Sequence, residues 1–214
     1  MLPELTRTWA NGWAVSRRTP APVDHPWGLY LEVNAPGQVG RHVITDPTRE
    51  GVRAAAATVT VPDTWLKVPA DPELVAEWLP EGWVVDFPEC GHLMATDLVA
   101  SSPTPPAGYT ATLATTDDVV HARVSDHRDE PAARGQQALL GGAVVVDRVS
   151  TEPAHRRRGL GGLVMRSLAD DAVARGAVLG VLGATDAGRA LYETLGWRAH
   201  SRLSACVYRP SRRG

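Results

Sequence analysis

The stretch that decides the fold is His155-Arg156-Arg157-Arg158-Gly159-Leu160-Gly161-Gly162. It follows an apolar run over residues 143–151 that predicts a strand, and it opens an amphipathic pattern that predicts a helix ending at Arg175-Gly176. Free N–H groups at a helix start, and glycines that let a ligand approach the backbone, favour phosphate binding. The sequence therefore predicts a phosphate-binding loop between a strand and a helix.

The spacing of these glycines excludes two common phosphate-binding motifs. The Gly-x-Gly-x-x-Gly fingerprint of dinucleotide-binding folds needs a third glycine where this chain has Val164. A mononucleotide loop ends in Gly-Lys-Ser/Thr, and the only lysine of the chain is Lys67, far from this stretch. The pattern that remains is Arg156-x-x-Gly159-x-Gly161.

This pattern resembles the pyrophosphate loop of the GNAT superfamily of acyl-CoA-dependent N-acyltransferases, which reads Arg/Gln-x-x-Gly-x-Gly/Ala. A second match follows, because residues 177–182 predict a strand and Leu191-Tyr192 with Gly196-Trp197 matches the family's Leu-Tyr-x-x-x-Gly-Phe corner, with Trp for Phe. Members often carry Asn and Ala where this chain has Thr185 and Gly188. The resemblance covers residues 109–209 and implies the GNAT fold, an α/β fold with a mixed, mostly antiparallel, twisted sheet flanked by helices.

The resemblance also implies roles for residues of both motifs. Tyr192 matches the family's general acid, and its ordinary pKa near 10 keeps it protonated at neutral pH; a packing tyrosine is the alternative. Backbone groups of the strand would pair with the pantetheine arm, and arginines would reach the phosphates. No metal ion is implied. The positions expected to bind acetyl-CoA are Val149, Ser150, Thr151, Arg156, Arg157, Arg158, Gly159, Leu160, Gly161, Gly162, Thr185, Arg189 and Tyr192.

A general base is less clearly marked. Asp147 lies in the predicted strand over residues 143–151, and strict alternation would put it on the same face as Val149 and Thr151. A carboxylate in an apolar strand is costly to bury without a partner. A catalytic role and a salt bridge to an arginine are therefore equal alternatives. His121 is a further candidate by its titration range, and a solvated histidine is the alternative there.

The proline-rich segment 101–108 predicts a linker between two lobes, over residues 1–100 and 109–214. Four strands are expected in the second lobe, over residues 109–114, 119–125, 134–140 and 143–151. GNAT proteins usually insert one or two helices between the first two of these strands, and only residues 115–118 occupy that gap here. We therefore expect the second lobe to lack part of its acceptor wall.

The first lobe is expected to supply that wall. Its predicted order resembles a degenerate second GNAT copy without the arginine-glycine loop, as in a tandem protein. Six of the seven tryptophans lie in this lobe; core packing explains most of them, and Trp27 is the one we favour for an acceptor pocket. The expected elements are helices over 2–13, 47–57 and 72–79 and strands over 28–33, 41–45, 64–68, 83–87 and 92–97.

Composition is that of an ordinary globular protein. The net charge of −2 gives no general attraction for nucleic acid, and no apolar run approaches the ~18 residues of a membrane span. The N-terminal residues lack a signal-peptide pattern, so we expect a cytoplasmic protein. Cys90 and Cys206 are expected to be reduced, buried thiols. Whether the chain is a monomer or a homodimer stays open.

Together these patterns predict an N-acetyltransferase that moves acetyl from acetyl-CoA to a primary amine, by direct attack without a covalent enzyme intermediate. A small-molecule amine is favoured over a protein tail, because no long acidic run suggests a lysine-rich partner. The alternative is a non-catalytic acyl-CoA-binding or sensing module. Nucleic-acid binding is disfavoured, because the chain lacks a basic helix and aromatic residues interleaved with basic ones.

Overall fold

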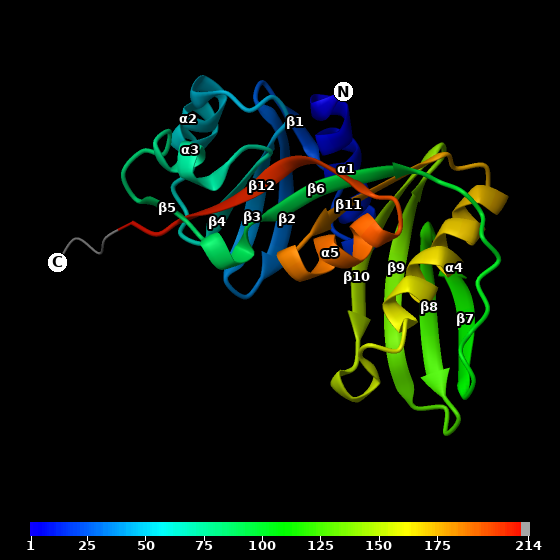
Figure 1. Cartoon of the computed structure of the whole chain (residues 1–214). Helices are drawn as coiled ribbons and strands as arrows, with labels where there is room; N and C mark the ends of the chain where they lie inside the picture. The colour runs from blue at the N-terminus through cyan, green and yellow to red at the C-terminus, as the bar shows by residue number, and fades with distance from the viewer. Residues whose placement is uncertain (211–214) are drawn as a thin grey trace.

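The structure is a computed structural model that describes residues 1–210. Twelve strands form one sheet in the order β1-β2-β3-β4-β12-β6-β11-β10-β9-β8-β7, with β5 paired to β12 (Figure 1). The pairs β3–β4 and β10–β11 are parallel, and the other pairs are antiparallel. The predicted α/β fold with a mixed, mostly antiparallel sheet is confirmed.

The strands are β1 (Val23–His25), β2 (Gly28–Ala35), β3 (Gln38–Ile44), β4 (Thr64–Val68), β5 (Trp83–Val85), β6 (Gly91–Asp97), β7 (Tyr109–Thr116), β8 (Val119–Asp126), β9 (Pro131–Leu140), β10 (Ala143–Thr151), β11 (Leu179–Ala184) and β12 (Arg198–Tyr208). The helices are α1 (Leu2–Arg17), α2 (Arg49–Ala57), α3 (Pro72–Ala76), α4 (Leu160–Ala174) and α5 (Asp186–Thr194), with short 3-10 turns at Phe87–Glu89 and Pro153–His155. All the predicted elements are present. The structure adds β1 and β12, and α3 and β5 are shorter than predicted.

Strands β6 and β12 join the two halves of the sheet (Figure 1). Strand β6 comes before the predicted linker, yet it pairs with β11 on one side and with β12 on the other. Strand β12 pairs with β6 along its first half and with β4 and β5 along its second half. The division into 1–100, 101–108 and 109–214 stays a prediction, and β6 shows that strands of the first segment complete the sheet of the last.

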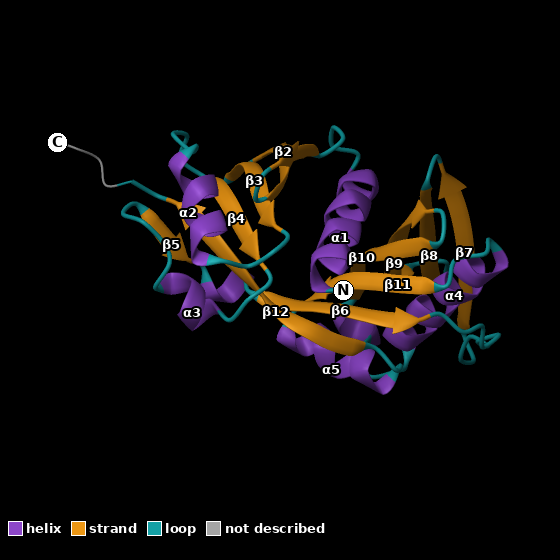
Figure 2. Ribbon diagram, turned by 90° about the horizontal axis from the view of Figure 1, so that it is seen from above, coloured by secondary structure: helices purple, strands orange, loops and turns teal. Residues whose placement is uncertain are grey.

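Helices cover both faces of the sheet around β10 (Figure 2). Helix α1 packs on β9, β10 and β11, while α4 and α5 lie on the opposite face. The two cores alternate along β10, because Val145 belongs to the core under α1 and Val146 to the core under α4. Both cysteines are buried and free, as predicted. No helix within residues 1–210 is long and apolar enough to cross a membrane.

Helix α1 approaches β10 closely through Gly12. An ideal Cβ at this position would lie 2.2 Å from Cγ2 of Val145. Trp9 and Trp13, one turn away on either side, are buried in the same core. The glycine therefore sets the distance at which α1 packs on the sheet, and the two tryptophans fill the space beside it.

Replacing Gly12 by alanine is expected to destabilise the protein, although alanine is the better helix former. Overpacking against Val145 costs up to about 3 kcal/mol, and the gain in helix propensity offsets about 1 kcal/mol of that. We expect the melting temperature to fall by roughly 4–8 °C for a chain of this size, measured by circular dichroism.

The control is Gly142→Ala, in the turn between β9 and β10. A Cβ at Gly142 would have no atom within 4 Å, so this variant should melt at the wild-type temperature or slightly above it. Equal melting temperatures for the two variants would contradict the close packing of α1 on β10.

Candidate functional site

Strands β10 and β11 separate in the middle of the sheet. They pair in parallel from Ala143 and Leu179 as far as Val146 and Leu182, and then no further. Each keeps its outer neighbour, because β9 pairs with β10 as far as Thr151 and β6 pairs with β11 as far as Ala184. The backbone edge of residues 147–151 that would face β11 is therefore left without a strand partner.

A β-bulge accompanies this separation. The register between β10 and β9 shifts between Asp147 and Ser150, and Arg148 has a left-handed φ of 53°. A bulge bends a strand and re-aims its side chains. Val149 packs on the core under α4, whereas Asp147 contacts α1 on the other face. The prediction that Asp147 shares a face with Val149 and Thr151 is therefore wrong, because the bulge breaks the alternation.

Two hollows meet where the strands separate. The first, which we call the loop groove, has a volume of about 870 Å³ and is lined by β10, the turn before α4, the first turn of α4, and α5. The second, the inner cavity, has a volume of about 550 Å³ and lies among α1, β3, β4, β10 and β11. Six residues line both hollows: Val146, Asp147, Arg148, Gly183, Ala184 and Thr185. This shared region is called the junction below.

The predicted phosphate-binding loop forms one end of the loop groove. Gly159 adopts a φ of +78° and precedes α4, whose first turn has no side-chain cap. Its backbone N–H groups are therefore free for a ligand, at the positive end of the helix dipole. An ideal Cβ at Gly161 would lie 3.0 Å from Cδ2 of Leu191. Glycine at this position thus keeps the groove open between α4 and α5.

The loop groove gathers most of the predicted site residues, but not all of them. Those lining it are Asp147, Val149, Ser150, Thr151, Arg156, Arg157, Gly159, Leu160, Gly161, Gly162, Thr185 and Tyr192. Two predicted residues lie outside. Arg158 donates to the Tyr109 hydroxyl at 3.1 Å, and Arg189 pairs with Glu193 at 2.6 Å along α5. Thr185 caps α5, as predicted, by accepting from the Gly188 N–H at 3.1 Å.

Tyr192 projects from α5 and is 8% exposed. Burial, and secondly the charge of Asp147, raise the pKa of its hydroxyl to about 12. The side chain is therefore a proton donor throughout the physiological pH range. An ideal Cβ at Gly188 would lie 3.1 Å from Cε2 of Tyr192, so glycine gives the tyrosine ring room that alanine would restrict. This explains the departure from the family pattern at Gly188.

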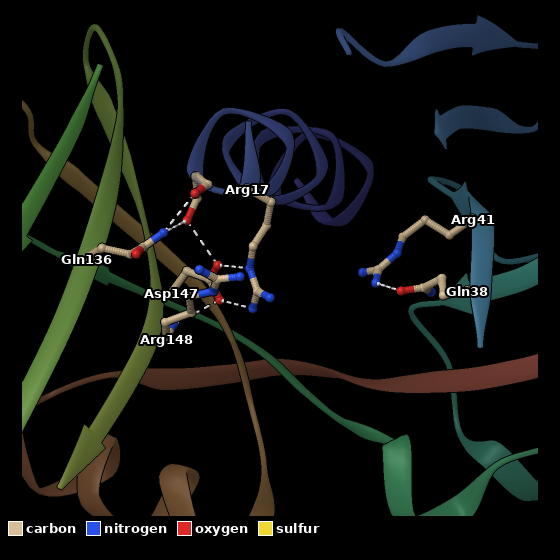
Figure 3. Close-up of polar contacts among 7 residues, drawn as sticks. Arg17, Gln38, Arg41, Gln136, Asp147 and Arg148 are labelled. Atoms are coloured by element: carbon tan, nitrogen blue, oxygen red, sulfur yellow. Dashed lines mark hydrogen bonds and ion pairs between the residues drawn. The ribbon is translucent and has the colours of Figure 1, made fainter. Parts of the chain in front are cut away.

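Asp147 is held in a network with α1 (Figure 3). Its carboxylate accepts hydrogen bonds from the Ser16 hydroxyl at 2.9 Å and from Arg17 Nε and Nη2, the latter at 2.8 Å. The backbone N–H of Arg148 donates at 2.9 Å. Burial alone would raise the pKa of Asp147, but Arg17 and the other donors hold it below its ordinary value. The salt bridge weighed in the sequence analysis is present.

The remaining sequence candidates lie away from the junction. His121 lies on β8, which β9 separates from β10, and it lines neither hollow. Trp27 does not line the inner cavity; it stacks on His25 with ring centroids 4.8 Å apart. Trp9 and Trp13 line the cavity instead. The preference for Trp27 is therefore wrong, because α1 brings the other two tryptophans to this face.

Sequence reasoning missed three cations that line the inner cavity: Arg17, Arg41 and Lys67. Arg17 extends the stripe of Trp9 and Trp13 by one further turn, a spacing that could have identified it. Arg41 and Lys67 lie within largely apolar strands, where a charged residue is rare. Those positions were the available signal, but their meeting in one cavity depends on strand pairing.

Comparisons with known proteins agree with this architecture. Residues 141–206 match the family model described as FR47-like protein. The chain is similar to a GCN5-related N-acetyltransferase from Kribbella flavida, with a TM-score of 0.67 and 19% identity over 97% of this chain and 95% of the other. A GNAT-family protein from Novosphingobium aromaticivorans gives a TM-score of 0.61 and 18% identity over 98% and 99%.

A further similar structure is a tandem GNAT protein from the clavulanic acid biosynthesis pathway, with a TM-score of 0.56 and 13% identity over 76% of this chain and 69% of the other. No curated protein sequence matches the chain. At these identities the likeness establishes the fold. The resemblance to the GNAT superfamily is thus confirmed as a likeness of fold, while the degenerate second copy over residues 1–100 stays a prediction.

Replacing Asp147 by asparagine is expected to lower the free energy of unfolding at pH 7 by about 1–3 kcal/mol, because Arg17 loses its counter-charge. The folded-state pKa of Asp147 lies below its unfolded value, so the stabilising contribution is complete above about pH 4 and is lost as the pH falls through the folded pKa. The difference between the variant and the wild type should therefore shrink below about pH 4. Chemical denaturation across this pH range measures it.

The matched control is Asp117→Asn, which removes an exposed carboxylate 3.6 Å from Arg18. We expect a change within about 0.5 kcal/mol at any pH, since exposed ion pairs contribute little. An Asp147→Asn variant as stable as the wild type at pH 7, or one whose deficit persists at pH 3, would contradict the ion-pair account.

Proposed function

We propose that this chain, which has the fold of the GNAT acetyltransferases, transfers the acetyl group of acetyl-CoA to a primary amine of a small molecule. The observation that carries the proposal is the junction, where the loop groove and the inner cavity meet beside the unpaired edge of β10. Two substrates can approach one another there from opposite sides. Residues that can bind an anion and donate a proton line the same groove.

The loop groove suits acetyl-CoA, which supplies the acetyl group as an activated thioester. The first turn of α4, with Gly159 and Gly161, would hold the pyrophosphate through backbone N–H groups. The guanidinium groups of Arg156 and Arg157 line the same groove and add charge-assisted hydrogen bonds. Residues 147–151 would pair with the pantetheine arm through their free backbone edge, as a neighbouring strand does.

The inner cavity suits the acceptor. Its volume of about 550 Å³ lies in the range of small-molecule sites. Helix α1 and strands β3 and β4 form one side of it, so the N-terminal segment would provide the acceptor wall that the short link at residues 117–118 between β7 and β8 cannot provide. This arrangement supports a small-molecule amine as the acceptor.

Two side chains at the junction would assist the transfer. Tyr192 would donate its proton to the departing thiolate sulfur, since its raised pKa keeps the hydroxyl protonated. Asp147 has a lowered pKa and is therefore a weak proton acceptor. We assign it a different task, in which its negative charge draws the amine to the junction and holds Arg17 in place. The attack is direct, and no residue is acylated.

The substitution Gly161→Asp should weaken acetyl-CoA binding by at least a hundredfold, because it puts a carboxylate beside the pyrophosphate and fills the space next to Leu191. Isothermal titration with acetyl-CoA measures the affinity. Gly142→Asp, in an open turn of the same chain, is the matched control and should bind normally. Unimpaired binding by Gly161→Asp would contradict the assignment of the loop.

The substitution Tyr192→Phe should leave acetyl-CoA affinity unchanged and lower the turnover number by about 10²-fold, the usual contribution of a positioned general acid. Release of free CoA in the presence of an amine measures turnover. Wild-type turnover in this variant would contradict the role of Tyr192. A protein that binds acetyl-CoA and never releases CoA with any amine would instead be a sensor.

A further inference from the structure

The far wall of the inner cavity carries two buried cations, Arg41 of β3 and Lys67 of β4. These strands are parallel neighbours, with Arg41 opposite Trp65 and Val43 opposite Lys67. Arg41 is 7% exposed and Lys67 is 8% exposed, and both line the cavity. Charged side chains are seldom buried to this degree without a partner of opposite charge.

Neither cation has such a partner. Arg41 donates one hydrogen bond from Nη2 to Oε1 of Gln38 at 2.6 Å, and its buried Nε has no hydrogen-bond partner. Its guanidinium lies 3.9 Å from the ring centroid of Trp13. Lys67 donates from Nζ to the carbonyl oxygen of Glu89 at 3.2 Å. Within residues 1–210, no carboxylate oxygen lies within 4.0 Å of either cationic group.

The two charges disfavour one another. Burial, and next the charge of Arg17, lower the pKa of Arg41 to about 10. Burial, and next the charge of Arg41, lower the pKa of Lys67 to about 8. Both groups are still protonated at neutral pH. An anion bound between them would satisfy free donors and reduce this repulsion.

The rest of the cavity is arranged differently. At the junction Asp147 neutralises Arg17, while Arg41 points toward this pair from across the cavity (Figure 3). Glu89 contributes its backbone carbonyl to Lys67, and its own side chain is exposed. The cavity thus has a carboxylate at the junction and unpaired cations at its other end.

From this polarity we infer that the acceptor amine also carries an acidic group, a carboxylate or a phosphate ester, which Arg41 and Lys67 bind while the amine lies beside Asp147. The inference rests on the proposed function. Arginine offers a planar fork of donors to an oxyanion, and lysine adds a point charge. Arg41 and Lys67 are therefore specificity-determining residues that touch the acceptor away from the reacting atoms.

The first experiment compares matched amines as acceptors, with acetyl-CoA as donor and CoA release as the readout. The panel holds α-, β- and γ-amino acids, each beside its own amide, and O-phosphoethanolamine beside ethanolamine. We expect the preferred acid to exceed its neutral partner at least tenfold in kcat/KM, mostly through KM. The carboxylate and phosphate arms distinguish the two acidic groups.

The second experiment repeats the panel with Arg41→Gln and Lys67→Met. Each variant should lower kcat/KM for the preferred acid at least tenfold, leave the neutral partner unchanged, and bind acetyl-CoA as the wild type does. The control is Arg53→Gln on the exposed face of α2, which removes a cation outside the cavity. Thermal unfolding checks that each variant folds, and Lys67→Met carries the comparison if Arg41→Gln does not.

The same amines are also titrated into the protein saturated with CoA, so that binding is measured without turnover. Acid preference that both variants abolish supports the anion site in either assay. Equal use of acids and amides, or a preference that both variants retain, overturns it while CoA release still upholds the transferase. Variant-sensitive acid binding without any CoA release would retain the anion site and remove the proposed function, and neither binding nor release would remove both.

Discussion

The separation of β10 from β11 is the constraint on which the rest of the site depends. Each strand keeps its outer partner, so the sheet stays continuous while the inner ladder stops after Val146 and Leu182. The bulge at residues 147–150 bends β10 away and turns Asp147 toward α1. A cohesive sheet thereby exposes backbone hydrogen-bonding groups in its interior, at the place where the loop groove and the inner cavity meet.

Helix α1 gives the inner cavity its character. It packs on β10 through Gly12, and this contact positions Trp9, Trp13 and Arg17 along one wall of the cavity. The ion pair between Arg17 and Asp147 then ties the first helix of the chain to the bulge in the tenth strand. The N-terminal segment is thus part of the site itself, and the polarity of the cavity comes from residues on both sides of it.

The elements that local patterns determine were predictable from the sequence. The turn at Gly159, the amphipathic helix α4 and the cap at Thr185 depend on neighbouring residues, and the structure contains all three. The face of Asp147 was not predictable, because a bulge of one left-handed residue, Arg148, reverses the alternation. The meeting of Arg41 and Lys67 was also out of reach, since it depends on the parallel pairing of strands 20 or more residues apart in the chain.

Amide hydrogen exchange with and without acetyl-CoA tests the central claim most directly, that the separated strands and the α4 turn form the donor site. The account predicts that acetyl-CoA slows exchange at residues 147–151 and at the first turn of α4, because these N–H groups would gain hydrogen-bond partners. Exchange in β7 and β8 should stay unchanged. Protection confined to other elements, or none at saturating acetyl-CoA, would contradict the account.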